Sequence, residues 1–302
     1  MIDIAIIGAG PAGLTAGLYA GRGGAKAVVF EEMFSGGQAA STYKIENYPG
    51  FPDGVSGMDL GMLMEQQAQR FGTEIKNERV TSLELDGAVK RIKTDGGEYE
   101  AKTVILAFGA APRPLGVENE EKLRGMGVSY CATCDGAFFR DKTVAVVGGG
   151  DTAIADAIYL ARFAQKIYVI HRRDSLRASS ALQETAFANE RIAFVWDSVV
   201  EGLIGDQALS ALKLKNVKTG ELSQLDVSGV FVAVGTMPKT ELVSGKVELS
   251  GDQYILTDVH MKTNIQGVFA AGDVRVSPLK QVVTAVADGA VAASEAIAYI
   301  NK

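Results

Sequence analysis

Few residues in this 302-residue sequence are of the kinds that bind metal ions. It contains two cysteines, Cys131 and Cys134, and two histidines, His171 and His260, which lie far apart in the chain. Zinc sites usually require four nitrogen or sulfur ligands, so we expect no metal site. A lone C-x-x-C pair in a reducing compartment is more often redox-active than structural, and a pair of buried or metal-binding thiols is the alternative.

An excess of positive charge is also absent. Lys and Arg total 30 against 36 Asp and Glu, which gives a formal net charge of −6. Nucleic-acid binding depends on clustered positive charge, so we expect no nucleic-acid partner. Small acidic ligands are not excluded, because they need only local positive charge.

Signals for export or for a membrane span are lacking as well. The N-terminal residues Met1–Ile4 carry no basic region, and the most apolar stretch near the C-terminus is interrupted by Asp288 and Glu295. We therefore expect a soluble cytoplasmic protein with no membrane association. The length suggests one large or two ordinary domains, and the apolar fraction of 47% is ample for their cores.

Glycine, in contrast, is abundant, at 35 residues, and two glycine-rich turns share one pattern. The first follows the apolar run 2–7 and precedes a helical pattern and a second apolar run that ends at Glu31. In such a unit Gly8 allows a tight turn, Gly10 lets the backbone approach a pyrophosphate, and Gly13 lets helix and strand pack closely. Glu31 can accept a hydrogen bond from a ribose 2′-hydroxyl, and a solvated strand end is the alternative.

The second turn follows the apolar run 143–148 and reproduces the spacing of the first. At the end of its second strand, basic side chains replace the carboxylate. A fork of guanidinium groups binds a ribose 2′-phosphate bidentately, whereas a carboxylate would repel it. This unit is therefore predicted to bind NADPH, and a solvated basic turn is the alternative. The residues concerned are Gly148, Gly150 and Ala153 in the turn, and His171, Arg172, Arg173 and Arg177 after the strand.

Two β-α-β units with equal spacing predict an α/β fold of two Rossmann-like dinucleotide-binding domains, each with three ββα layers. Because the second unit lies inside the chain, we expect its domain to be inserted into the first. The first domain is expected to cover 1–113 and 244–302, and the inserted domain to cover 114–243. Further helices are expected at 57–72 and 279–299, and short strands within 74–107 and 192–234.

The two cysteines lie just before the second glycine-rich unit. A C-x-x-C disulfide closes a small ring and can cycle, because either thiol can be the attacking or the leaving group. Asp135 follows Cys134 directly, where it can transfer a proton to or from a thiolate. A carboxylate that merely caps a turn is the alternative for Asp135.

The segment Cys131–Gly136 resembles the active-site motif of the bacterial-type, low-molecular-weight thioredoxin reductases. The resemblance covers nearly the whole chain. The segment from His171 to Arg177 is similar to the family's motif for the 2′-phosphate of NADPH. Other segments are similar to those with which the family contacts its flavin, and the residues concerned are Gly37, Gln38, Asn47, Gly272, Asp273, Lys280, Gln281 and Val282.

The resemblance implies a homodimer in which the discontinuous domain binds FAD and the inserted domain binds NADPH and carries the redox-active pair. Electrons would pass from NADPH through FAD and the Cys131–Cys134 disulfide to oxidised thioredoxin or a thioredoxin-like protein. By the same resemblance, Cys134 lies nearest the flavin, Cys131 attacks the disulfide of the partner, and Asp135 is the acid/base. A rotation between the domains would let nicotinamide and disulfide reach the flavin in turn.

The sequence departs from the family pattern at four places, which are Phe108, Met126, Ala137 and the pair Ala155-Asp156. Met126 and Ala137 lie where the family docks thioredoxin, so they bear on the identity of the partner. Two other functions suit the same scaffold, a dithiol oxidase that passes electrons to oxygen and a flavin-binding redox sensor. The arginine cluster argues against the oxidase, which has no use for NADPH.

Overall fold

The computed structural model describes residues 1–42 and 44–302. The chain divides into two compact units, which are Met1–Ala111 with Met237–Lys302, and Pro112–Thr236. The boundaries thus differ by a few residues from those expected, because residues 112–113 belong to the inserted unit and residues 237–243 to the first. The chain enters and leaves the inserted unit along β7 (Ala110–Pro112) and β16 (Thr236–Pro238), which pair with each other. A boundary inside a strand has no turn residues to mark it in the sequence.

A parallel sheet with the order β3-β2-β1-β6 forms the centre of the first unit. The end of β6 also pairs with parallel β17, whereas its beginning pairs with antiparallel β5, which continues to β4. The strands are β1 (Ile2–Ile7), β2 (Ala27–Glu31), β3 (Glu74–Asn77), β4 (Val80–Glu84), β5 (Lys90–Thr94), β6 (Glu98–Leu106) and β17 (Val268–Ala270).

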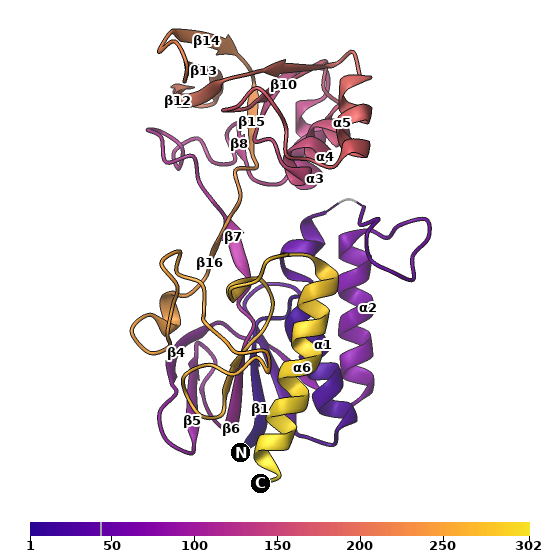
Figure 1. The fold of residues 1–302 in the computed structure, drawn as a ribbon, viewed down its shortest axis with the longest axis vertical. Coiled ribbons are helices and arrows are strands. Elements are labelled where there is room, and N and C mark those ends of the chain that lie inside the picture. Colours follow the sequence, from indigo (N-terminus) through magenta and orange to yellow (C-terminus); the bar gives the residue numbers. More distant parts are fainter. Residues whose placement is uncertain (43) are drawn as a thin grey trace. The chain divides into compact units, whose positions relative to one another are not determined.

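Helices cover one face of this sheet, where α1, α2 and α6 lie side by side (Figure 1). Alternate residues of β1 point to opposite faces, as a strand requires, and both faces are buried. Ile4 and Ile6 pack in the core beneath the helices, while Ala5 and Ile7 pack in the core shared with β4 and β5. The helices are α1 (Pro11–Arg22), α2 (Gly57–Arg70) and α6 (Val282–Ile300), with short 3-10 turns at Gly37–Ser41, Glu241–Val243 and Gly272–Val274.

The final helix, α6, is long and apolar enough to cross a membrane by length and composition alone. It packs along α1, and at Gly289 a side chain would overlap the carbonyl of Ala12. Its two carboxylates are both engaged, Asp288 with Arg275 and Glu295 with Lys262. A helix of a soluble core passes the same test of length and composition, so this helix is weak evidence for a membrane span.

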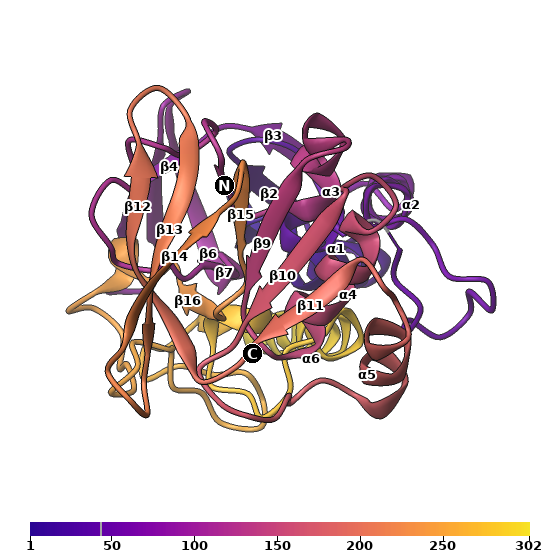
Figure 2. The same cartoon turned by 90° about the horizontal axis from the view of Figure 1, so that it is seen from above.

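The inserted unit repeats the three layers. Its parallel sheet has the order β11-β10-β9-β15-β8, with α3, α4 and α5 on one side and the antiparallel sheet β12-β13-β14 on the other (Figure 2). Val144 and Val146 of β9 pack with the helices, while Ala145 and Val147 pack with β12–β14. The expected fold class, two Rossmann-like domains with one inserted into the other, is confirmed. The strands are β8 (Val128–Ser129), β9 (Thr143–Val147), β10 (Lys166–Ile170), β11 (Ile192–Val195), β12 (Ser198–Gly205), β13 (Leu209–Asn216), β14 (Leu222–Asp226) and β15 (Gly229–Val232). The helices are α3 (Ala132–Asp135), α4 (Asp151–Leu160) and α5 (Ser180–Phe187), with a 3-10 turn at Gly136–Phe139.

Candidate functional site: two glycine-rich turns and a disulfide

The first glycine-rich turn joins β1 to α1 and leaves no room for side chains at two of its glycines. Gly8 has a φ of +107°, and a Cβ there would overlap the carbonyl oxygen of Ala107. A Cβ at Gly13 would overlap the carbonyl oxygen of Gly8, so helix and strand meet backbone to backbone. Above Gly10 the space is open, because the nearest heavy atom to a Cβ there is the Cα of Gly37, at 4.0 Å.

Two neighbouring segments are bonded to this turn. The N–H of Gly36 donates to the carbonyl of Ala9 at 2.8 Å, which brings Gly37 beside Gly10, and Gln38 follows in the 3-10 turn Gly37–Ser41. The N–H of Ala9 in turn donates to Oε2 of Glu31 at 2.7 Å. The other oxygen of Glu31 accepts from the N–H groups of the next two residues, at 2.9 and 3.1 Å. The carboxylate is thereby fixed at the end of β2, beside the turn.

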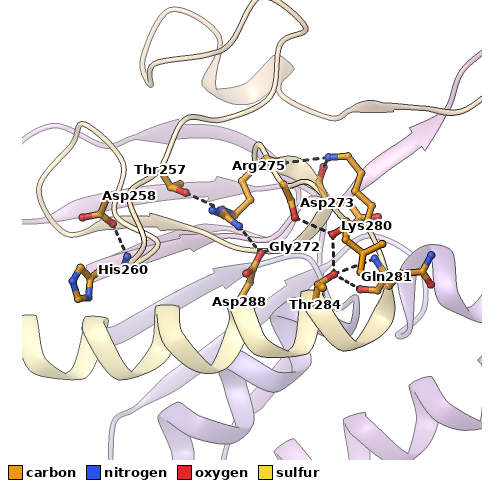
Figure 3. A network of polar contacts seen from close by, with 12 residues as sticks. Thr257, Asp258, His260, Gly272, Asp273, Arg275, Lys280, Gln281, Thr284 and Asp288 are labelled. Carbon is orange, nitrogen blue, oxygen red and sulfur yellow. Dashed lines mark hydrogen bonds and ion pairs between the residues drawn. The ribbon is translucent and has the colours of Figure 1, made fainter. Parts of the chain in front are cut away.

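The C-terminal candidates lie in the same unit, in the 3-10 turn Gly272–Val274 and at the start of α6 (Figure 3). Nδ2 of Asn47 donates to Oε1 of Gln281 at 2.9 Å, which joins two candidates that are far apart in the sequence. Gln281 caps α6, and Val282 is the first residue of the helix. At Gly272 a Cβ would lie 2.9 Å from that of Ala12, so this segment packs against the first turn of α1.

Asp273 and Lys280 face each other across this segment. Burial raises the pKa of Asp273, and the nearby Lys280 ammonium opposes the rise. Burial likewise lowers the pKa of Lys280, and the carboxylate of Asp273 opposes the fall. Nζ of Lys280 also lies 3.8 Å from the centre of the Tyr254 ring. The two groups are therefore held in a partly desolvated environment, where their mutual attraction is stronger than in water.

The second glycine-rich turn, between β9 and α4, has the same character. Gly148 has a φ of +149°, and a Cβ there would overlap the carbonyl oxygen of Ala233. That Cβ would also lie 2.8 Å from the Cβ of Ala153, so alanine fits in place of the third glycine only because Gly148 is bare. Around a Cβ at Gly150 nothing lies within 4 Å.

The basic residues after β10 form a positive cluster beside this turn. Burial lowers the pKa of His171, and the charges of Arg177, Arg173 and Arg172 lower it further. Those three arginines are exposed, and in the described part of the chain none of them forms an ion pair. The N–H of Arg177 donates to the carbonyl of Gly149 at 2.7 Å, which holds the cluster against the turn.

His171 differs from the arginines because its side chain is buried, with 5% exposure. A Cβ at Gly149 would overlap its ring, so the ring packs directly beneath the glycine-rich turn. Its Nε2 has no hydrogen-bond partner among the residues described. The structure therefore places His171 under the turn, with the arginines outside.

Asp151, which was not predicted from the sequence, holds the segment that follows the basic cluster. Oδ1 of Asp151, at the start of α4, accepts from the N–H of Ser179 at 2.7 Å. With the bond from Arg177 to Gly149, it fixes both ends of the short segment that carries Arg177. An acidic residue directly after the Gly-Gly-Gly run was the available signal.

Cys131 and Cys134 form a disulfide with their Cα atoms 5.3 Å apart. Cys131 caps the short helix α3 and is half-buried, and its Sγ accepts from the N–H of Cys134 at 3.1 Å. The side chain of Cys134 is exposed. The pair is thus accessible to a reaction partner while its backbone is ordered.

Ser129, also missed from the sequence, connects Asp135 to the disulfide. Its buried hydroxyl donates to Oδ2 of Asp135 at 2.6 Å and accepts from the N–H of Cys131 at 3.0 Å. Directly before Cys131, the hydroxyl of Tyr130 donates to Oε1 of the buried Glu120 at 2.6 Å. These contacts fix the backbone on the N-terminal side of the disulfide.

Two apolar side chains that are close to the disulfide in the sequence are exposed. Phe138 is 74% exposed and Met126 is 53% exposed, whereas Phe139 packs against Phe231 with ring centres 5.4 Å apart. Ala137, between these groups in sequence, is exposed as well. In residues 1–42 and 44–302, no three His, Cys, Asp or Glu side chains lie close enough together to hold a metal ion.

Comparisons of the sequence and of the structure with known proteins agree with one another. Residues 2–289 match the pyridine nucleotide-disulphide oxidoreductase family. The chain is 48% identical to the thioredoxin reductase of Peptoclostridium acidaminophilum over 305 residues, covering 99% of this chain and 97% of the relative. It is also 48% identical to that of Streptomyces coelicolor over 301 residues, covering 99% and 94%. Among solved structures, the thioredoxin reductase of Lactococcus lactis superposes with a TM-score of 0.97 at 44% identity, covering 100% of this chain and 99% of the other.

Proposed function

Because the chain belongs to the pyridine nucleotide-disulphide oxidoreductase family, we propose that it is an NADPH-dependent thioredoxin reductase. It passes electrons from NADPH through FAD and the Cys131–Cys134 disulfide to oxidised thioredoxin or a thioredoxin-like protein. The observation that carries the proposal is an accessible C-x-x-C disulfide in a unit whose glycine-rich turn is flanked by three arginines that form no ion pair with the described residues.

The first unit, 1–111 with 237–302, is the FAD-binding domain in this proposal. Its residues fit the cofactor, because the turn is open above Gly10 and no side chain from the described residues caps the N-terminus of α1. Free N–H groups and the positive end of the helix dipole then bind a pyrophosphate. The fixed carboxylate of Glu31 accepts from a ribose hydroxyl. When bound, FAD takes up a hydride from a nicotinamide and supplies two electrons to a disulfide.

The remaining flavin-binding residues belong to the two segments that pack on the same turn. Gly37 lies beside Gly10 with Gln38 next to it in the chain, and Gly272 lies beside Ala12. The carboxylate of Asp273 accepts no hydrogen bond from the other residues described, so it is available to the ribityl hydroxyls. The last group surrounds the start of α6 and consists of Asn47, Lys280, Gln281 and Val282.

The inserted unit, 112–236, binds NADPH. The pyrophosphate lies over the open position at Gly150, and the guanidinium groups of Arg172, Arg173 and Arg177 bind the 2′-phosphate. Buried His171 supports the turn from below. With a pKa lowered by burial it is neutral near pH 7, which avoids a buried charge beneath the turn.

The disulfide chemistry rests on three side chains. In the reduced enzyme the Cys131 thiolate attacks a disulfide of the partner and forms a mixed disulfide. Cys134 then attacks Cys131, which releases the reduced partner and restores the disulfide of this chain. Asp135, held by Ser129, moves the protons that these steps require.

Location, assembly and the remaining partners belong to the same proposal. We propose a cytoplasmic homodimer that binds no nucleic acid and no membrane. The net charge of −6 and the engagement of both carboxylates of α6 support the last two points.

The two alternatives make different demands on the electron acceptor. A dithiol oxidase consumes oxygen and needs no NADPH, and a redox sensor does not turn over. The test is NADPH consumption with a panel of thioredoxins and glutaredoxins, with oxygen alone as the control. Rapid turnover that requires a thioredoxin supports the proposal, and equal rates with oxygen alone would contradict it.

A further inference from the structure

The geometry points to Asp288 and its partner Arg275 as positioning residues for the flavin. We propose that they hold the Gly272-Asp273 segment in the conformation that FAD binds, and so set the affinity for the cofactor. The inference rests on the proposed function, because Asp273 is assigned there to the ribityl chain. Neither Asp288 nor Arg275 belongs to the residues that the sequence motifs single out.

Asp288 reaches this segment from the second turn of α6 (Figure 3). Its Oδ2 accepts from the N–H of Gly272 at 3.1 Å and from Nη1 of Arg275 at 3.1 Å. Nε of Arg275 donates to Oγ1 of Thr257 at 2.8 Å, which fixes the guanidinium group. Both charged side chains are 14% exposed, so the pair is shielded from solvent far more than an ordinary surface ion pair.

Gly272 depends on this support for two reasons. Its φ is +78°, a left-handed conformation that glycine adopts as readily as others, so the backbone needs an outside contact to stay in it. Gly272 is also the first residue of the 3-10 turn Gly272–Val274, where its N–H needs an acceptor outside the turn. It also packs closely on Ala12, in the first turn of α1. A shift of Gly272 therefore moves Asp273 relative to the glycine-rich turn, and the two sites must bind parts of one cofactor.

The segment is held on its other side as well. Nζ of Lys280 lies 3.4 Å from the carbonyl oxygen of Asp273 and 3.3 Å from that of Arg275. The backbone around Asp273 is thus held at its N-terminal side by a carboxylate and at its C-terminal side by an ammonium group. Since the Asp273 carboxylate accepts no hydrogen bond from the other described residues, the network fixes its backbone and leaves its side chain for a ligand.

The competing explanation is that the ion pair only docks α6 on the unit. Glu295 provides a matched control, because it lies on the same helix and its Oε2 pairs with Lys262 at 2.8 Å. A docking role predicts similar effects when either carboxylate is removed. A positioning role predicts an effect on FAD that is specific to Asp288.

The experiment measures release of FAD from the purified holoenzyme by the rise in flavin fluorescence on dilution, for wild type, Asp288→Ala, Asp288→Asn and Glu295→Ala. We expect the dissociation constant to rise by about tenfold or more in Asp288→Ala. Asn retains an acceptor for the Gly272 N–H, so Asp288→Asn should recover part of the affinity. Glu295→Ala should stay within about twofold of wild type. The visible flavin spectrum should shift in Asp288→Ala only.

Wild-type affinity in Asp288→Ala, or equal losses in Asp288→Ala and Glu295→Ala, would overturn the inference. If Asp288→Ala does not fold, Asp288→Asn is compared with Glu295→Gln, and weaker binding is again expected for the first alone. A wild-type chain that binds no FAD would instead contradict the proposed function.

Discussion

Replacement of Arg172 and Arg173 by alanine should remove most of the preference for NADPH over NADH. The two nucleotides differ by one phosphate on the adenosine ribose, so discrimination must come from groups around that phosphate. In the structure the two guanidinium groups are exposed and lie beside buried His171, whose pKa they lower. They carry charge that no carboxylate of the described chain neutralises by an ion pair.

The magnitude follows from the number of contacts and their exposure. A hydrogen bond to a charged group contributes about 1.5–3 kcal/mol, and solvent and salt reduce this at an open site. Two or three such contacts therefore leave about 2–4 kcal/mol, which is roughly 30- to 1,000-fold in kcat/KM. Arg177, whose backbone is bonded to Gly149, stays in the double variant and should preserve a small remainder.

The assay is steady-state disulfide reductase activity with each nucleotide at fixed ionic strength. The loss should appear mainly in KM for NADPH, because the phosphate is remote from the hydride and binds ground and transition states alike. Arg140→Ala, which removes an exposed arginine elsewhere in the same unit, serves as the control. Equal kcat/KM for NADPH and NADH in the wild type would refute the reasoning and favour a solvated basic turn.

Three further predictions concern the inserted unit. Ser129→Ala should slow thiol–disulfide exchange by about 5- to 30-fold, because Asp135 loses its hydrogen-bond donor, and should leave flavin reduction by NADPH unchanged. Ser129→Thr should restore the rate of exchange. Stopped-flow measurement of the two half-reactions tests both expectations. Phe138→Ala should raise KM for thioredoxin by about tenfold, since this 74%-exposed ring lies close to the disulfide in sequence. The control Leu222→Ala, which changes a 64%-exposed side chain on β14, should leave KM unchanged. Equal KM values for wild type and Phe138→Ala would argue against docking at Phe138. Burial raises the pKa of Asp156 to about 7, so the folded state holds a proton that the unfolded state releases between about pH 4 and pH 7, and stability falls as pH rises through that window. The rise in its pKa from 3.8 to about 7 corresponds to about 4 kcal/mol, so Asp156→Asn should be more stable than wild type by about that amount at pH 8 and close to it near pH 4. Thermal unfolding at the two pH values measures the difference, and a pH-independent difference would count against the raised pKa.

Much of the fold could be predicted because its signals are local. The repeated spacing of Gly8 to Glu31 and of Gly148 to His171 marks two strand–turn–helix–strand units, and the structure contains both. The boundary near 237 was less accessible, because β16 carries the chain from one unit to the other without a break in pattern. The segments beside the turn, such as Gly37 and Gly272, were found by resemblance, since nothing in their own composition relates them to Gly10.

The supporting residues could not be found in this way. Ser129, Asp151 and Asp288 act on backbone N–H groups that only the folded chain brings to them. In the sequence, Asp288 was notable only because it interrupts an apolar stretch. In the folded chain its carboxylate is bonded to Gly272 and Arg275. The sequence places His171 directly after the strand that follows the second turn, but its burial beneath Gly149 depends on packing that motifs do not encode.

The most direct test of the electron path compares wild type with Cys131→Ser and Cys134→Ser under anaerobic conditions. NADPH is added first, the flavin absorbance is followed, and oxidised thioredoxin is then supplied. Hydride transfer to FAD requires no thiol, whereas exchange with thioredoxin requires both cysteines of this chain. We predict that NADPH bleaches the flavin in all three proteins and that only the wild type then reduces thioredoxin at a catalytic rate. Catalytic reduction of thioredoxin by either serine variant would contradict the account.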